Sequence, residues 1–188
     1  MKKITGVICA AIASLLTIGN AEAQKAVFDK GDFGLTVDYV AGRVSYGGES
    51  SLMNGVQLMG EYAFMNVINE KGSISAALIL GVEGADVTGV DSYHRFRFAT
   101  RGMMHYSFAP KFDVYGGINF GFVDVDKWKW EYIDGEGKKW SKSDSDADFI
   151  QPSVVAGCRY MFTKNFGVNA EATWDWFQMV ACGLTFKF

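Results

Sequence analysis

The chain of 188 residues has no long apolar stretch after its first 23 residues. The longest later run, 76–82, has seven residues and includes a glycine. A helix that spans a bilayer needs about 18 or more apolar positions, so a membrane protein built from helices is excluded. The hydrophobic content of 49% also excludes a disordered chain, and the length fits one domain.

The amino-terminal segment has the organisation of a signal peptide. Two lysines follow the first Met, an apolar core covers 7–18, and Ala21 and Ala23 are small residues at the positions that a signal peptidase inspects. A buried first helix is disfavoured because the charge order and the small-residue end coincide. We predict cleavage before Gln24. The predicted boundaries are 1–23 for the signal peptide and 24–188 for the exported domain.

The predicted mature chain lacks a basic excess and has few cysteines. It carries 16 basic and 20 acidic side chains, a net charge of −4. A nucleic-acid partner would require a basic surface, so none is expected. Only Cys158 and Cys182 remain after cleavage, which is too few for a disulfide framework.

Alternation with a period of two residues dominates the chain after Gln24. Apolar residues recur at every second position in eight segments of roughly ten residues, with turns rich in glycine, aspartate and serine between them. This pattern predicts antiparallel strands. The segments are 33–39, 56–64, 74–80, 96–108, 112–122, 150–162, 166–174 and 180–188.

The two faces of these segments differ in charge. The apolar faces contain no Asp, Glu, Lys or Arg, whereas the opposite faces carry nine charged residues. A soluble sandwich or a lipocalin-like barrel would show the same alternation with its apolar face inward. Alternation alone therefore leaves both orientations open. The charged residues are Asp38, Glu61, Arg95, Arg97, Arg101, Asp113, Arg159, Glu171 and Lys187.

Three patterns favour an apolar face that meets lipid. Short and long turns alternate, as they do between the two ends of an outer-membrane barrel. Aromatic residues such as Phe108 and Phe112 gather at strand ends, which is typical of membrane interfaces. Charges on a lipid-facing wall would cost about 2–4 kcal/mol each near the midplane, so the charged faces belong inside. The short turns are 69–72, 109–111 and 163–165, and the long ones are 41–51, 83–92 and 124–148.

The predicted fold is therefore all-β, an eight-stranded antiparallel up-and-down transmembrane β-barrel preceded by a signal peptide. Segments 114–118 and 159–168 resemble strand and turn sequences of the small bacterial outer-membrane β-barrel family, which includes outer-membrane proteins of the A, X and W types. The carboxyl end resembles the strand by which the barrel-assembly machinery recognises such proteins. The alternating residues of that end are Val180, Cys182, Leu184, Phe186 and Phe188.

This resemblance covers 30–188 and implies a location in the bacterial outer membrane. It implies contacts with outer-membrane lipid and lipopolysaccharide, and with the assembly machinery during biogenesis. We expect a monomer. The family has no shared catalytic or ligand motif, so the resemblance implies no activity.

The interior of an eight-stranded barrel is about wide enough to be filled by its own side chains. Buried charges must pair, so we predict a plug of ion pairs; a narrow, mildly anion-favouring channel for small solutes is the alternative. A tight turn that sets Phe162 opposite Phe166 would place Arg159 across from Asn169 and diagonal to Glu171. By the same logic Arg101 lies across from Asn119, and His105 across from Tyr115. The predicted network comprises Asp38, Glu61, Arg95, Arg97, Arg101, Arg159 and Glu171.

The longest predicted loop, 124–148, is interpreted as a hairpin that projects beyond the membrane, with Asp134-Gly135 near its tip. Its aromatic residues alternate with charges and are a candidate adhesive or sugar-binding edge. Alternatively, the rings rest against lipopolysaccharide or neighbouring loops. The candidate edge consists of Trp128, Trp130, Tyr132 and Trp140.

No cofactor, metal site or catalytic residue is predicted. The acidic, serine-rich run 141–148 has no ordered ligand spacing for calcium. His105 and Ser107 are residue types that a lipid A-modifying enzyme would use, but both fall on the inward face near a short turn. The inferred register supplies no acidic residue to orient His105. An outer-membrane enzyme is therefore the third alternative, after a surface-interaction role and a channel.

Overall fold

The computed structural model describes most of the predicted exported domain. None of the described residues forms a helix that is long and apolar enough to cross a membrane. The predicted signal peptide and its cleavage site before Gln24 lie outside the described residues. These residues are 26–46, 49–68, 70–85, 93–125, 129–133, 139–143, 149–174 and 179–188.

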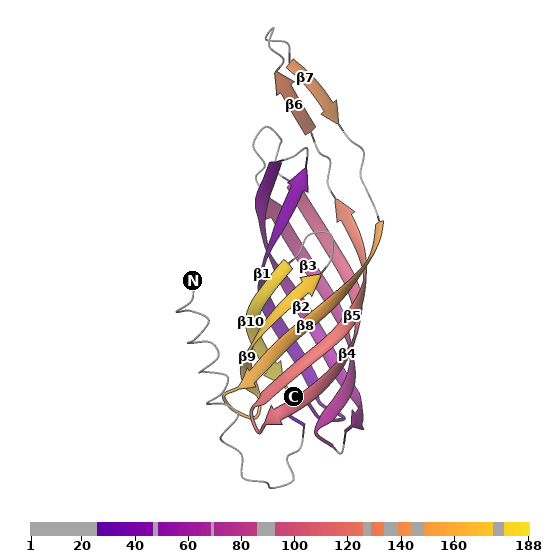
Figure 1. The fold of residues 1–188 in the computed structure, drawn as a ribbon, viewed down its shortest axis with the longest axis vertical. Coiled ribbons are helices and arrows are strands. Elements are labelled where there is room, and N and C mark those ends of the chain that lie inside the picture. Colours follow the sequence, from indigo (N-terminus) through magenta and orange to yellow (C-terminus); the bar gives the residue numbers. More distant parts are fainter. Residues whose placement is uncertain are drawn as a thin grey trace, which may run out of the picture.

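Eight strands close into an all-antiparallel barrel in the order β1-β10-β9-β8-β5-β4-β3-β2, which confirms the predicted fold (Figure 1). Two short strands, β6 and β7, pair only with each other, in a ribbon beyond one end of the barrel (Figure 1). We call that end the hairpin end, and the opposite end, with the β2–β3, β4–β5 and β8–β9 turns, the turn end. The strands are β1 Phe33–Tyr46, β2 Glu49–Val67, β3 Gly72–Ala85, β4 Tyr93–Ala109, β5 Phe112–Val125, β6 Lys129–Ile133, β7 Lys139–Ser143, β8 Phe149–Met161, β9 Phe166–Trp174 and β10 Met179–Lys187.

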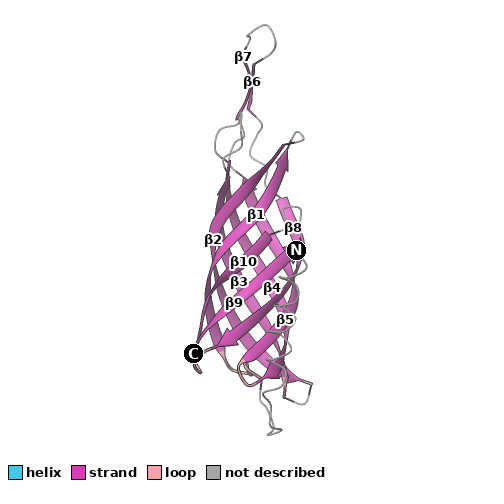
Figure 2. Cartoon of the chain, turned by 60° about the vertical axis from the view of Figure 1, so that its left-hand side comes forward, coloured by secondary structure: helices cyan, strands magenta, loops and turns pink. Residues whose placement is uncertain are grey.

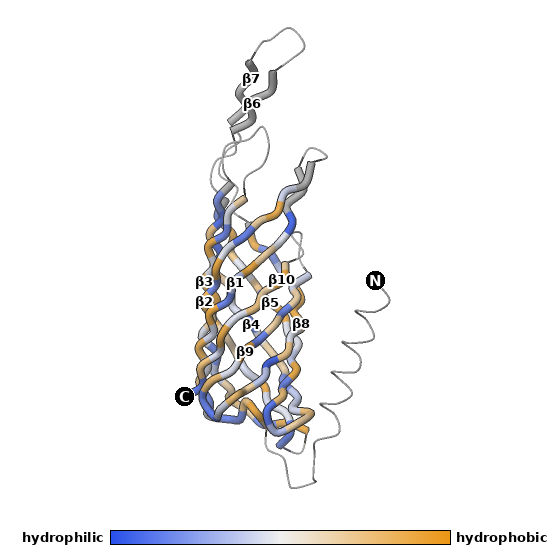
Figure 3. The backbone as a smooth tube through the Cα atoms, turned by 90° about the vertical axis from the view of Figure 1, so that its left-hand side faces the viewer, coloured by the Kyte–Doolittle hydropathy of each residue, from blue (hydrophilic) through white to orange (hydrophobic). Residues whose placement is uncertain are grey.

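The wall of the barrel has the reverse polarity of a soluble protein. Outward-facing apolar side chains are exposed, as with Ile150 at 73% and Phe120 at 60%, whereas Glu61 and Arg95 inside are 0% and 1% exposed. Hydropathy consequently alternates along each barrel strand (Figure 3). The apolar faces predicted from the sequence are the outward faces. Their area would be unfavourable in water and suits a hydrocarbon environment.

The barrel closes where the first strand meets the last. β1 pairs with β10 from Gly34 opposite Lys187 to Ala41 opposite Val180. Within this seam Gly183 lies opposite Asp38, and a Cβ atom at position 183 would collide with the backbone oxygen of Val37 and with Asp38. A glycine at this position therefore allows the two strands to approach.

One predicted long loop is absent. β1 extends to Tyr46 and β2 begins at Glu49, and these two residues are paired, so 41–51 consists mainly of strand. The expectation of a long loop was wrong because glycine and serine in this stretch were interpreted as turn residues. The prediction of a projecting hairpin within 124–148 is confirmed by the β6–β7 ribbon (Figure 2). In this ribbon Ile133 pairs with Lys139, and the predicted Asp134-Gly135 tip lies outside the described residues.

Candidate functional site

The most distinctive chemistry lies inside the barrel near the turn end. His105 from β4 has its Nδ1 atom 2.7 Å from Asp113 Oδ2, and its Nε2 atom 2.7 Å from Glu61 Oε1. Glu61 also binds Arg159, whose Nη2 atom donates to Oε2 at 2.7 Å. We call these four residues the lower cluster. The tight turns place them here, because each lies within a few residues of the turn end of its strand.

The absence of an acidic orienting residue for His105 was an incorrect expectation. Asp113 lies opposite Ser107, two residues from His105 along β4, and reaches the imidazole diagonally. The register prediction itself is confirmed, since His105 pairs with Tyr115 and Arg101 with Asn119. The directly opposite residue was considered for His105, and the diagonal one was overlooked.

Ser75 completes an arrangement that resembles the Ser–His–Asp set of hydrolases. Its Oγ atom lies 3.0 Å from His105 Nε2, and His105 Nδ1 faces Asp113. However, Ser75 donates its hydroxyl hydrogen to Glu61 at 2.7 Å, and Glu61 also occupies His105 Nε2. With a carboxylate on each ring nitrogen, both nitrogens act as donors and neither can accept the serine proton. All four side chains are at most 1% exposed, so a substrate has no direct access.

Aromatic rings pack around the lower cluster. The Arg159 guanidinium lies 4.9 Å from the centre of the Phe28 ring and 5.4 Å from that of Tyr115, which are cation–π distances. The His105 ring lies 5.4 Å and 5.2 Å from the same two rings. These rings exclude water, and thereby strengthen the ion pairs that they surround.

Arg101 and Glu171 form a second group, the middle cluster, which crosses the interior beside Tyr115. Arg101 Nη1 donates to Glu171 Oε1 at 2.8 Å, and the Tyr115 hydroxyl donates to the same oxygen at 2.9 Å. Arg159 pairs with Asn169 along the sheet as predicted, but its ion partner is Glu61 and not the diagonal Glu171. Glu171 instead pairs with Arg101, from a strand on the other side of the lumen.

Asp38 lies in the same region and is held by amides. Gln57 Nε2 and Asn169 Nδ2 each donate to one of its carboxylate oxygens at 2.7 Å. Gln57 in turn accepts a hydrogen bond from Arg97 Nη2 at 2.6 Å. Asp38 is thus connected to a cation through an intervening side chain, without a direct ion pair to Arg97.

Glu83, Arg95 and Arg97 form a third group, the upper cluster, which lies toward the hairpin end. Glu83 of β3 forms an ion pair with Arg95, and its other oxygen lies 3.6 Å from Arg97. Arg95 Nη2 also contacts the Met179 sulfur at 2.9 Å. Glu83 was missed as an interior residue because the sequence Glu-Gly-Ala-Asp that it begins was interpreted as a turn. Its position, two residues beyond Gly81 on the alternating face, could have revealed it.

The buried charges of the described interior balance. Five carboxylates face four arginines and His105, so an imidazolium at position 105 makes the sum zero. The seven predicted network residues are all buried inside the barrel, and the structure adds three to them. The carboxylates are Asp38, Glu61, Glu83, Asp113 and Glu171, and the arginines are Arg95, Arg97, Arg101 and Arg159.

Apolar side chains also fill part of the interior, beside Arg101, whose Nη1 atom contacts the sulfurs of Met59 and Met103. Met59, Ile79 and Met103 point inward and are at most 2% exposed, and they pack with Ala77, Ala99 and Tyr115. A layer of this kind has no polar groups to replace the hydration shell of an ion. The interior therefore contains an apolar layer as well as ion pairs.

The segment that precedes β1 closes the turn end. Phe28 is 1% exposed, and its backbone oxygen accepts a hydrogen bond from Ser73 Oγ at 2.5 Å. Val27 N donates to Ser107 Oγ at 2.7 Å, and Lys187 Nζ donates to the Val27 oxygen at 2.8 Å. Residues 26–32 were not predicted to have a role, since a lone phenylalanine in a polar stretch gives no periodic signal.

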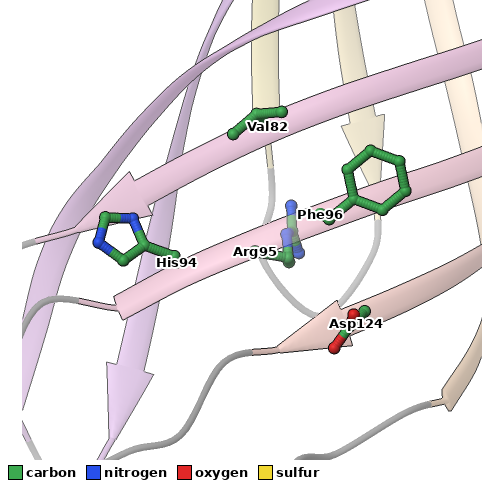
Figure 4. Close-up of a pocket in the computed structure, with 5 residues that line it drawn as sticks. All are labelled: Val82, His94, Arg95, Phe96 and Asp124. Atoms are coloured by element: carbon green, nitrogen blue, oxygen red, sulfur yellow. The ribbon is translucent and has the colours of Figure 1, made fainter.

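A small pocket lies near the hairpin end, at the ends of β3, β4 and β5 (Figure 4). Its volume is about 180 Å³, and its lining residues include one histidine, His94, and one carboxylate, Asp124. None of the described residues that line it is a serine, threonine or cysteine, so these residues supply no nucleophile for acyl transfer. The described lining residues are Val82, His94, Arg95, Phe96 and Asp124.

The β6–β7 ribbon carries three of the four predicted edge residues. Its register pairs Tyr132 with Trp140, and Trp130 with Lys142. Directly opposed residues of an antiparallel pair share a face, so one face of the ribbon gathers three aromatic positions and one lysine. Trp128 lies outside the described residues.

The fold defines a class: a closed eight-stranded antiparallel barrel with an apolar wall and a charged interior is the architecture of small outer-membrane β-barrels. No protein-family model and no curated protein sequence matches the chain. Solved structures do share its fold. The attachment invasion locus protein Ail of Yersinia pestis has a TM-score of 0.58 at 15% identity, with 85% of this chain and 99% of that chain covered.

Two further structures agree. Neisserial surface protein A has a TM-score of 0.57 at 12% identity, with 84% of this chain and 98% of that chain covered. The outer-membrane protein OprG of Pseudomonas aeruginosa has a TM-score of 0.55 at 12% identity, with 89% and 99% covered. At these identities the similarity establishes the fold, which is that of the small outer-membrane barrels.

Proposed function

We propose that this protein is an integral barrel of the bacterial outer membrane that contacts partners outside the cell through its β6–β7 hairpin. The observation that carries the proposal is the combination of an apolar outer wall with a ribbon that extends beyond the barrel (Figure 2). The predicted export signal supports the same location. The barrel is a monomer in this proposal, and the carboxyl-terminal segment 180–188, which ends in Phe188, serves its assembly.

A surface-interaction role accounts for the features better than catalysis or transport. His105 is buried and Glu61 occupies its Nε2 atom, and the described residues that line the Figure 4 pocket offer no nucleophile. Ail, which shares the fold, is described as an attachment invasion locus protein, and a structure of it contains the heparin analogue sucrose octasulfate. The aromatic face of the β6–β7 ribbon supports a glycan as the partner here, because sugar rings stack on aromatic rings.

Membrane integration is tested by cell fractionation and electrophoresis with and without boiling. A closed barrel in the outer membrane should be recovered in the membrane fraction and should change mobility only after heating. A protein that is soluble in the periplasm and migrates identically in both lanes would overturn the proposal.

The hairpin is tested by replacing Trp130, Tyr132 and Trp140 with serine. We expect at least about a tenfold loss of affinity for immobilised neutral or sulfated oligosaccharides, since aromatic anchors commonly carry most of the binding energy. The matched control replaces Lys129, Glu131 and Ile133 instead. These residues alternate with Trp130 and Tyr132 along β6, and this variant should bind normally. Equal binding by both variants and the wild type would exclude the aromatic face as the contact.

The interior predicts that the barrel conducts poorly. In planar bilayers the purified protein should give no current steps above the leak, because ion pairs and the Met59–Ile79 layer occupy the lumen. Reproducible steps with anion preference would instead support the narrow channel. An Ile79→Gly variant, which removes part of the apolar layer, measures how far that layer contributes.

A further inference from the structure

Three consecutive turns at the turn end are built alike and each carries a lysine. The Lys71 oxygen accepts a hydrogen bond from Ser107 N at 2.9 Å, and the Lys111 oxygen accepts one from Met161 N at 2.8 Å. In the next turn, the Asn165 oxygen accepts one from Lys187 N at 2.9 Å, directly after Lys164. Each turn is thus fastened to the next hairpin, and the three lysines follow one arc of the rim from β2 to β9. We call Lys71, Lys111 and Lys164 the lysine arc.

The lysine arc has an excess of positive charge. All three side chains are exposed, and none of them takes part in an ion pair with another described residue. Lys111 Nζ donates to the Phe162 oxygen at 3.3 Å, which brings the β4–β5 and β8–β9 turns together. Glu70 is the one acidic residue within these turns.

The other charged side chains described on the outer rim of this end lie beside the amino-terminal segment. Lys187 pairs with Asp32 at 2.8 Å, and Asp29 accepts a hydrogen bond from Asn66 at 2.5 Å. Lys30 is exposed on the same side. The uncompensated positive charge is therefore concentrated on the arc.

Lipid-facing phenyl rings lie next to the arc. Phe108 is 53% exposed and Phe162 is 49% exposed, and both lie within three residues of an arc lysine. Aromatic rings of this kind mark the boundary between hydrocarbon and headgroups. The ammonium groups then stand at headgroup depth, where each basic residue contributes to the binding of anionic lipid.

We propose that the lysine arc is a binding surface for the phosphate headgroups of anionic phospholipids in the leaflet at the turn end. This inference rests on the proposed membrane location. The phosphate meets the lysines while the acyl chains lie along Phe108 and Phe162. The contact fixes the depth and the direction of the barrel in a bilayer whose two leaflets differ in charge.

The test compares three proteins in nanodiscs with equal amounts of phosphatidylglycerol and phosphatidylcholine. They are the wild type, the arc variant (Lys71→Gln, Lys111→Gln, Lys164→Gln) and a control variant with the same charge change at the other end (Lys129→Gln, Lys139→Gln, Lys142→Gln). After extraction into mild detergent, mass spectrometry of the retained lipid gives the ratio of the two phospholipids. Heat-dependent mobility verifies that each barrel is inserted.

We expect the wild type and the control variant to retain phosphatidylglycerol about threefold above its share in the disc, and to lose this excess in 0.5 M salt. The arc variant should retain the bulk ratio. Equal ratios for all three inserted proteins, or an equal loss in the control variant, would overturn the lipid surface while leaving the membrane location intact. Failure of the wild type to insert would overturn both proposals, and displacement of the lipid by polyglutamate would assign the arc to an acidic peptide instead.

Discussion

Replacing Arg159 with methionine should lower the free energy of unfolding of the refolded barrel by about 3–5 kcal/mol. The substitution removes the cation that binds Glu61 at 2.7 Å and stacks on Phe28 and Tyr115. Glu61 would then share a single cation, His105, with Asp113, and the interior sum would become −1. Urea titration in detergent micelles, followed by tryptophan fluorescence, measures the change.

The interpretation of that result depends on a second variant and a surface control. Arg159→Met combined with Glu61→Gln should recover part of the loss, because the carboxylate that Arg159 neutralises is removed together with it. Lys164→Met removes an exposed charge and should change the free energy by less than about 0.5 kcal/mol. If Arg159→Met is as mild as Lys164→Met, the lower cluster does not stabilise the barrel.

Gly183→Val should prevent closure of the barrel. The new Cβ atom would meet the Val37 oxygen and the Asp38 backbone, which belong to the facing strand and cannot rotate away as a long side chain would. β1 and β10 would separate at the one seam that joins the two ends of the barrel sequence. Electrophoresis without boiling should show loss of the compact form, and protease should digest the protein.

Gly102→Val is the matched control for closure. Position 102 also lies in a barrel strand, but a Cβ atom there has no heavy atom within 4 Å. Valine suits an outward strand position, so this variant should fold as the wild type does. A compact, protease-resistant Gly183→Val barrel would show that the seam tolerates a side chain.

The sequence predicts the wall of this barrel better than its contents. The wall is readable because every second residue meets the same environment, and short turns fix the register, as in the pairing of Arg159 with Asn169. Ion pairs through the lumen follow a different rule. Arg159 and Glu61 are 98 residues apart, and Arg101 and Glu171 are 70 apart, on strands that are not neighbours in the sheet.

Such pairs depend on strand tilt and on how far side chains reach across the lumen, neither of which a local pattern contains. The register argument considered only adjacent strands, so it connected Arg159 to Glu171 and not to Glu61. Asp113 is on a strand adjacent to His105 but was overlooked, because only the residue directly opposite His105 was considered. Glu83 was not recognised as an interior residue, because the end of β3 has the composition of a turn. The hairpin was recognised because its aromatic residues alternate and the sequence Asp134-Gly135 is a local turn signal.

The attachment of the first described residues to the last strand has a consequence for the order of assembly. Lys187 of β10 holds the Val27 oxygen and the Asp32 carboxylate, and Phe33 and Phe188 exchange backbone hydrogen bonds. The amino-terminal segment therefore gains these partners only when the final strand arrives. The bonds of the same segment to Ser73 and Ser107 belong to β3 and β4 and do not depend on β10. Closure of the seam therefore adds the last fixed points of this segment, and a nascent barrel that stalls before β10 would lack the anchor that Lys187 provides.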